Sequence, residues 1–195
     1  MAEKKIVRCT WSTGGNALYI DYHDKEWGVP ARDDRTQFEF LILEGAQAGL
    51  SWSTILNKRE GYREAFAGFD PECIARFGKK DVTRLMNNPG IVRNRLKIEA
   101  AISNARAFLE FDAPLGFAQY MWSFVGGKPL QNKIKEHGQV PVTSKESDAL
   151  AKDLKKRGFR FVGSTIIYAH MQATGMVNDH LTSCFRFKEC QALAK

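Results

Sequence analysis

The sequence lacks any apolar run approaching the length of about 20 residues that a transmembrane helix needs. It also lacks internal repeats and low-complexity tracts, and it has only 6 prolines in 195 residues. These absences exclude solenoid, collagen-like and largely disordered chains. The first residues, Met1 to Ile6, contain no apolar segment like that of a signal peptide. We therefore expect a cytosolic protein that makes no membrane contact. Separately, we expect a monomer, and the bacterial cytosol as its location.

The sequence has only four cysteines, and its basic residues moderately outnumber its acidic ones. The four cysteines of a cytosolic protein are expected to be thiols or metal ligands rather than disulfides. Lys and Arg outnumber Asp and Glu by 29 to 22, which gives a net charge of +7. This excess is compatible with a polyanionic partner such as DNA, and equally with a merely basic soluble protein.

Apolar spacing and capping residues predict an all-α fold, without the sustained alternation that marks strands. Capping boxes are expected at Asp34 with Gln37 and at Thr143 with Glu146. The stretch from Gly126 to Val142 is predicted to be a polar loop. The predicted helices run from Asp34 to about Gly49, from Trp52 (capped by Ser51) through Leu56, from Pro71 (capped by Asp70) to Gly78, from Asp81 to Asn87, from Val92 to Leu109, from Tyr120 to Val125, from about Thr143 to Gly158, and from Ser164 (as the cap) to Gly175.

One carboxylate lies in an otherwise apolar helix. Glu44 and Gln47 interrupt the segment from Phe38 to Trp52, and a helix that is apolar on nearly every side belongs inside a protein. A buried carboxyl group needs hydrogen-bond partners or has its pKa raised by desolvation, which active sites exploit. A satisfied buried glutamate, or one that reaches the surface, remains the structural alternative.

A second feature is a Pro-Gly turn followed by basic residues. Pro89 and Gly90 separate two predicted helices, and Arg93, Arg95 and Lys97 follow directly. The start of a helix offers free backbone N–H groups to an anion such as a DNA phosphate. An ordinary helical hairpin with solvated charges is the alternative interpretation.

Residues that can bind metal stand near both ends of the chain. Cys9 and His23 lie near the start, and His180 and Cys184 lie four residues apart near the end, which would place them on one face of a helical turn. Two Cys and two His suit a tetrahedral zinc site, but the spacing does not show that the two pairs meet. Cys190 is a rival ligand.

Aromatic residues are dense in the same N-terminal region. They are Trp11, Tyr19, Tyr22 and Trp27, followed by Trp52. Aromatic rings are usually core residues, but Tyr22 lies in a polar stretch beside His23. We interpret a pair of these rings as a sandwich for a planar base.

Four motifs, in this order along the chain, resemble 3-methyladenine DNA glycosylase I. They are Tyr19–Pro30 (YIDYHDKEWGVP), Leu43–Trp52 (LEGAQAGLSW), Lys155–Gly163 (KKRGFRFVG) and Gly175–His180 (GMVNDH). The resemblance implies a helix-hairpin-helix DNA glycosylase fold, with one domain over residues 1–195 in two helical lobes and the hairpin near residues 81–109. It also implies one structural zinc ion that joins residues 9–23 to residues 180–184 through Cys9, His23, His180 and Cys184.

The resemblance further assigns the base pocket and the DNA contacts. Glu44, Tyr22 and Trp52 would form the pocket, with Trp11 and Tyr19 as further walls and Glu44 as the catalytic group. Gly49 and Leu50 would fill the gap left by a flipped nucleotide. The hairpin residues Gly90, Ile91, Val92 and Arg93 would bind the DNA backbone.

Two departures from the wider superfamily bear on the mechanism. Val92 stands in place of the second hairpin glycine, and no Asp follows before Asp112. We therefore expect a monofunctional hydrolase that releases 3-methyladenine from alkylated double-stranded DNA without a Schiff base, and we interpret Asp179 as structural. The alternatives are a non-enzymatic, zinc-stabilised DNA-binding module and a glycosylase whose specificity has shifted, for example towards 3-methylguanine.

Overall fold

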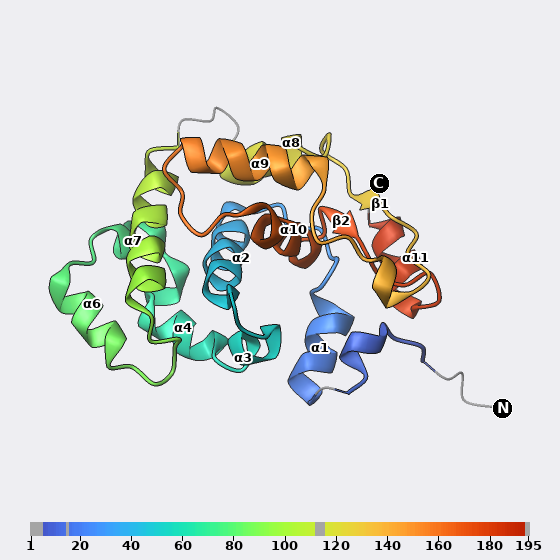
Figure 1. Cartoon of the computed structure of the whole chain (residues 1–195), viewed down its shortest axis with the longest axis horizontal. Coiled ribbons are helices and arrows are strands. Elements are labelled where there is room, and N and C mark those ends of the chain that lie inside the picture. The colour runs from blue at the N-terminus through green and yellow to red at the C-terminus, as the bar shows by residue number, and fades with distance from the viewer. Residues whose placement is uncertain (1–5, 15, 112–115, 194–195) are drawn as a thin grey trace.

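The computed structural model describes residues 6–14, 16–111 and 116–193. These residues form eleven α-helices and one sheet of two very short strands (Figure 1). The helices are α1 (Ala17–Lys25), α2 (Asp34–Gln47), α3 (Trp52–Leu56), α4 (Arg59–Ala65), α5 (Pro71–Ala75), α6 (Lys79–Met86), α7 (Arg95–Leu109), α8 (Phe117–Ser123), α9 (Lys145–Lys156), α10 (Ser164–Ala173) and α11 (Phe185–Ala192), and the strands are β1 (Leu130–Gln131) and β2 (Val177–Asn178).

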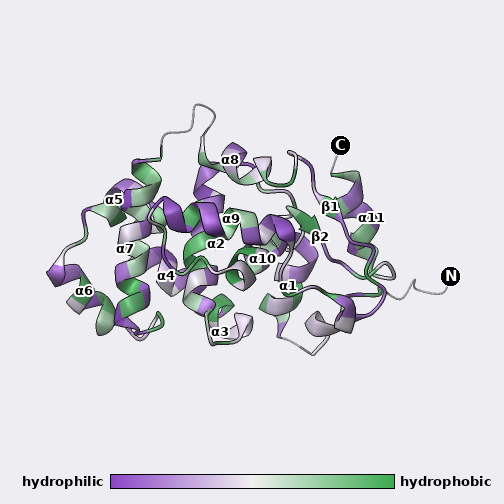
Figure 2. Cartoon of the chain, turned by 45° about the horizontal axis from the view of Figure 1, so that its top comes forward, coloured by the Kyte–Doolittle hydropathy of each residue, from purple (hydrophilic) through white to green (hydrophobic). Residues whose placement is uncertain are grey.

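Helix α2 lies at the centre of the molecule, between α7 and α10 (Figure 1). It contributes to three hydrophobic clusters: Phe38 packs with α5 and α7, Leu41 with α8 to α10, and Phe40 with α1 and the C-terminal segment. This position explains why nearly every side of α2 is apolar. Peripheral helices such as α6 and α9 show both hydrophilic and hydrophobic residues, as expected for one buried face (Figure 2).

The predicted capping box of α2 is wrong. Asp33 is the cap, because its side chain accepts a hydrogen bond from the backbone N–H of Thr36 (2.8 Å). The Asp34 carboxylate instead accepts from the N–H of Ala118 (2.8 Å) at the start of α8. Gln37 is buried and pairs with His170 of α10. Both predicted capping residues are thus used in tertiary contacts, which local sequence does not reveal.

The turn between α6 and α7 begins and ends differently from the prediction. Gly78 caps α6, and Asp81 reaches back from the third helical position to the Gly78 N–H (3.0 Å). Helix α7 starts at Arg95 with Asn94 as its cap, three residues later than predicted. The Val92 N–H donates to the Tyr62 hydroxyl (3.2 Å), which holds this part of the turn outside the helix.

The C-terminal half departs from the prediction in small ways. The predicted box at Thr143 is displaced by one residue, because Ser144 and Ser147 cap α9 reciprocally. Gly163, not Ser164, precedes α10 as its cap. The predicted polar loop contains β1, which pairs in parallel with β2. Two-residue strands are too short to show an alternating pattern, so the all-α prediction describes the architecture but misses this sheet.

The N-terminal segment contacts the C-terminal segment at the start of α11. Helices α1 and α11 are on the same side of the molecule (Figure 1), and the Phe185 N–H donates to the Val7 carbonyl (3.0 Å). Helices α1, α4 and α11 were not predicted from the sequence, and α8 starts three residues earlier than predicted. Within the described residues, every helix is too short or too polar to cross a membrane.

Candidate active site

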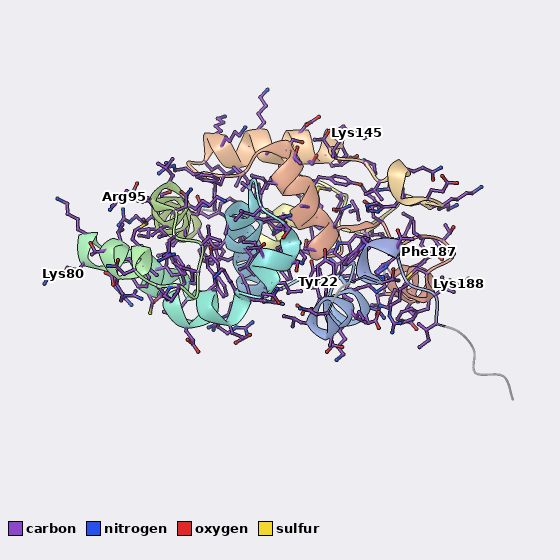
Figure 3. The ribbon with its side chains drawn as sticks, turned by 60° about the horizontal axis from the view of Figure 1, so that its bottom comes forward. Tyr22, Lys80, Arg95, Lys145, Phe187 and Lys188 are labelled. Atoms are coloured by element: carbon purple, nitrogen blue, oxygen red, sulfur yellow. The ribbon has the colours of Figure 1, made fainter. Side chains whose placement is uncertain are left out.

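A cavity of about 360 Å³ lies where α1, α2, α3 and α10 approach one another. This volume falls within the range of pockets that hold small ligands, roughly 300–1,000 Å³. Its walls include Tyr22, Glu44 and Trp52, as predicted, together with Trp11 and Tyr19. Figure 3 shows Tyr22 where α1 faces the central helices. The structure therefore gathers all five predicted pocket residues around one space.

Glu44 is buried in the last turns of α2, with 3% of its surface exposed. Its Oε2 atom is fully buried and has no hydrogen-bond partner among the described residues. Desolvation by burial raises the pKa of this carboxyl group to about 8. The satisfied-glutamate alternative is therefore wrong, and Glu44 is mostly protonated at neutral pH while the cavity holds no cation.

The aromatic rings form walls rather than an open slot. The ring centroids of Tyr22 and Trp52 are 5.3 Å apart, with their planes inclined by 45°. A base between two rings needs about 7 Å, twice the optimal carbon–carbon separation. Tyr22 and Trp52 are therefore too close together to be the ring pair of the predicted sandwich, which the sequence left unspecified. Trp11 packs edge-on against Tyr19 at 5.1 Å and extends the aromatic lining.

Polar residues from α2, α10 and the segment after β2 complete the cavity. Gln47, Gln172 and Asp179 all line it, and His137 lies in the wall formed by the 130–142 segment. Of these residues, only Gln47 was noted in the sequence, as a polar residue within the apolar run, whereas Gln172 and His137 were not predicted. Nothing in the spacing of Gln172 marks it, since only the packing of α10 against α2 directs it to this space.

Cys9, His23, His180 and Cys184 form one buried cluster, although the sequence could not show that the two pairs meet. Their ligand atoms all lie within 4.8 Å of one another. The His180 Nδ1 atom is 3.5 Å from Cys9 Sγ and 3.7 Å from Cys184 Sγ, which is 3.5 Å from His23 Nε2. His180 and Cys184 are not on a helical turn, because α11 begins only at Phe185.

The outer contacts of the two imidazoles suit metal ligation. The second nitrogen of His23, Nδ1, lies 2.7 Å from the Asp24 carboxylate, which Arg8 also binds. The second nitrogen of His180, Nε2, lies 2.9 Å from the Trp27 carbonyl oxygen. Such partners fix the ring orientation and direct the inner nitrogen of each ring towards the cluster, where His23 Nε2 also lies 3.3 Å from the backbone nitrogen of Cys9. Cys190 is buried but lies outside the four-residue cluster, and Cys73 is half-buried elsewhere.

The loop after α2 exposes an apolar side chain. Gly49 has a φ of +77°, a conformation that glycine adopts readily, and Leu50 is 42% exposed. Lys97, in the first turn of α7, donates from Nζ to the Ala46 and Ala48 carbonyls (2.7 and 2.6 Å). A cation is favourable at these unpaired carbonyls, so α7 holds the end of α2 from which Leu50 projects.

The α6–α7 turn is less open than predicted. Ile91 is buried, and the Gly90 N–H is already bound by the Asn88 side chain (2.8 Å). A Cβ atom at Gly61 would lie 2.4 Å from the Gly90 carbonyl oxygen, which shows how closely the turn packs on α4. Arg93 is exposed, and Figure 3 shows Lys80 and Arg95 projecting at the end formed by α6 and α7. The basic character predicted for this region is present on the surface.

Comparison with known proteins decides the family. The profile described as Methyladenine glycosylase matches residues 11–187. The chain belongs to this family. DNA-3-methyladenine glycosylase of Haemophilus influenzae is 49% identical over 179 residues, which cover 91% of this chain and 96% of that protein.

Solved structures of the family agree. A crystal structure of 3-methyladenine DNA glycosylase I matches with a TM-score of 0.89 and 54% identity over 92% of this chain and 98% of that one. The Staphylococcus aureus enzyme, whose structure is described as the basis of 3-methyladenine recognition, matches with a TM-score of 0.87 and 37% identity over 91% and 95%. The predicted family is therefore confirmed.

Proposed function

We propose that this member of the methyladenine glycosylase family is a monofunctional DNA-3-methyladenine glycosylase of base-excision repair. It hydrolyses the N-glycosidic bond of 3-methyladenine in alkylated double-stranded DNA and leaves an abasic site. The observation that carries the proposal is the unpartnered, buried carboxyl group of Glu44 in an aromatic cavity of about 360 Å³. The enzymes named among its relatives support hydrolysis over a purely DNA-binding module.

The chemistry of the lesion defines what the cavity has to do. Methylation at N3 makes adenine cationic, which weakens the glycosidic bond and makes the base a good leaving group. The wall of Tyr22 and Trp52 attracts this cation through the ring faces, an attraction that neutral adenine does not share. The cavity therefore acts mainly by selecting and holding the base, while water attacks the sugar carbon as the base departs.

Glu44 recognises the edge of the base in this scheme. In the free protein its raised pKa keeps it mostly protonated near pH 7. A cation in the cavity favours the carboxylate, because opposite charges stabilise each other strongly where the carboxyl group is buried. Binding of the cationic base is therefore accompanied by proton release from Glu44, whose oxygens then accept hydrogen bonds from the base.

Access to the cavity requires the nucleotide to leave the helix. Flipping costs a few kcal/mol and is easiest for a damaged base. Leu50, exposed on the loop that starts at Gly49, is the apolar plug that fills the vacated stack. Its loop follows directly from the helix that carries Glu44, so one element presents both the plug and the recognition group.

The DNA backbone binds at the turn between α6 and α7, which we interpret as the helix-hairpin-helix element. Gly90, Ile91 and Val92 shape the turn, and Arg93 supplies exposed positive charge. The amine of Lys97, the lysine nearest this turn in sequence, is bound to the carbonyls of Ala46 and Ala48 at the C-terminal end of α2. Among the described residues no lysine lines the base cavity, which supports hydrolysis without a Schiff base.

The Cys9, His23, His180 and Cys184 cluster would hold one structural zinc ion. Tetrahedral zinc with Zn–S of about 2.3 Å and Zn–N of about 2.05 Å requires S···N edges of about 3.6 Å. Three of the four S···N edges, at 3.5, 3.5 and 3.7 Å, fit this requirement, and all four ligand atoms lie within 4.8 Å of one another. Zinc held by four protein ligands has no open position, so it would fasten the two chain ends and take no part in the chemistry.

Chromatography of the products from methylated duplex DNA tests the proposed activity. Release of 3-methyladenine, with the DNA strand left intact and no covalent complex trapped by borohydride, is the expected result. Release of 3-methylguanine in equal or greater amount would establish the shifted specificity instead. Binding to DNA without release of any base would establish the non-enzymatic alternative.

A further inference from the structure

Arg59, the first residue of α4, binds two acidic residues from different parts of the chain. Its Nε atom donates to Glu39 of α2, and its Nη1 atom donates to Glu26, which directly follows α1, both at 2.7 Å. Only 14% of the Arg59 side chain is exposed, although arginine is mostly exposed in proteins. Two carboxylates fix the planar guanidinium group in direction as well as in position, because its N–H groups form a rigid fork.

The contact with Glu26 joins the two sides of the base cavity. The Glu26 N–H donates to the Tyr22 carbonyl (3.0 Å), so Glu26 lies one helical turn after this cavity residue. On the other side, Arg59 is bound to α2, the helix that carries Glu44. Among the described residues, the pair of Arg59 and Glu26 is the only salt bridge between residues 16–28 and helices α2 to α4. Arg59 therefore ties the segment that carries Tyr22 to the helix that carries Glu44.

Arg59 also contacts an aromatic ring that packs against the cavity wall. Its guanidinium carbon lies 5.2 Å from the centroid of the Phe40 ring, within the range of a cation–π interaction. The Phe40 centroid lies 6.4 Å from that of Trp52 and 6.5 Å from that of Tyr22. Phe40 is buried in one hydrophobic cluster with both of these wall residues. A displacement of Arg59 is therefore passed through Phe40 to the two rings that face the base, since a close-packed interior transmits strain.

We propose that Arg59 is a positioning residue for base recognition, which fixes Tyr22 and Trp52 relative to Glu44 before a base enters. The inference deepens the proposed function and rests on it. A cavity whose walls are already in place loses less conformational freedom on binding, so its affinity for the base is higher. Arg59 acts without touching the base, because its side chain does not line the cavity. Its positive charge does not oppose a cationic base, because the two carboxylates that it binds balance that charge.

Arg59→Lys is the variant that tests this role. Lysine keeps the positive charge but loses the planar fork that binds two carboxylates at once. Calorimetry measures the affinity of the folded protein for free 3-methyladenine, and urea unfolding measures its stability. We expect the variant to bind the base about tenfold more weakly than the wild type, the scale of one lost contact. A loss of stability with unchanged affinity would show a merely structural ion pair and would overturn the proposal.

The matched control is Arg63→Lys, one helical turn further along α4. Arg63 also donates to Glu39 (3.1 Å), and its side chain is 41% exposed. In the part of the chain that the structure describes, Arg63 forms neither a salt bridge with Glu26 nor a cation–π contact with Phe40. The control is therefore expected to bind 3-methyladenine with wild-type affinity. Equal losses of affinity in the two arginine variants would contradict a specific role of Arg59.

A double-variant cycle tests whether Arg59 acts through Glu26. Glu26→Gln removes the charge that joins Arg59 to the Tyr22 segment, and this variant is expected to fold because Glu26 is 40% exposed. Both substitutions break the same contact, so the loss of affinity in the double variant should fall short of the product of the two single losses. Losses that multiply fully would contradict the shared action. If Arg59→Lys does not fold, unchanged affinity in Glu26→Gln overturns the proposal by itself.

Release of base from DNA separates the role of Arg59 from the proposed function. If wild-type protein releases 3-methyladenine, and Arg59→Lys and Glu26→Gln bind the free base as the wild type does, only the role of Arg59 fails. If wild-type protein releases no base from methylated duplex DNA, the proposed function fails.

Discussion

Replacement of Glu44 by glutamine should stabilise the protein at neutral pH while it impairs recognition of the base. The substitution keeps the size of the side chain and removes only its ability to ionise. The pKa of Glu44 is about 8 in the folded protein, against an ordinary value of 4.5. The folded state therefore holds the proton more tightly than the unfolded chain, and ionisation of the unfolded chain draws the equilibrium towards unfolding as the pH rises.

The magnitude follows from the pKa difference, at about 1.4 kcal/mol for each unit. The penalty is absent well below pH 4.5, grows to about 3 kcal/mol at pH 7, and levels off above pH 8. The stability advantage of Glu44→Gln should therefore increase by about 3 kcal/mol between pH 5 and pH 8. Because the side chain is fully buried, solvent screening reduces this figure little.

Urea unfolding of both proteins at a series of pH values measures this difference directly. Glu64→Gln, at an exposed position on α4, is the matched control and should show no comparable pH dependence. A stability difference between wild type and Glu44→Gln that stays constant from pH 5 to pH 8 would refute the assignment of Glu44 as a desolvated group that is protonated in the free protein.

Three further predictions concern the elements around the cavity. Lys97→Met should lower the free energy of unfolding by about 2 kcal/mol, because two charged hydrogen bonds to the end of α2 are lost. The control Lys152→Met, on the exposed face of α9, should have little effect. Equal urea midpoints for the two variants would contradict the capping role of Lys97. Leu50→Ala should reduce excision from duplex DNA by about tenfold and leave the binding of free 3-methyladenine unchanged, because only base flipping needs the apolar plug. Parallel losses in both assays would contradict this role of Leu50. Elemental analysis should find one zinc per chain in the wild-type protein. The His180→Ala, Cys184→Ala double variant should contain no zinc and should be destabilised by about 5 kcal/mol. A wild-type protein that is fully stable without metal would exclude a structural zinc site.

The helical architecture was largely predictable because it follows from local signals. The apolar character of α2 indicated a central helix, and Ser51 and Asp70 cap the helices that they were predicted to cap. Predictions failed where a side chain was engaged by a distant element, as with Asp34 at the start of α8. The Val92 N–H is likewise taken by a hydroxyl from α4, which delays the start of α7.

The candidate site was predictable to a different degree for each of its parts. Burial of Glu44 could be inferred from its neighbours in sequence, and its desolvation followed. The meeting of Cys9 with Cys184 depends on the whole path of the chain, so only the family resemblance indicated it. The contact between Tyr22 and Trp52 and the position of Gln172 depend on helix packing at the scale of a few ångströms, for which the sequence carries no periodic signal.

The central claim is that Glu44 recognises a cationic methylated base in this cavity. The most direct measurement is the rate at which wild-type protein and Glu44→Gln release 3-methyladenine from methylated duplex DNA, under single-turnover conditions and with the released bases identified by chromatography. The account predicts rapid release by the wild type and release slower by about 100-fold in the variant, the usual scale for loss of one electrostatic contact in a buried site. Equal rates from the two folded proteins would contradict it.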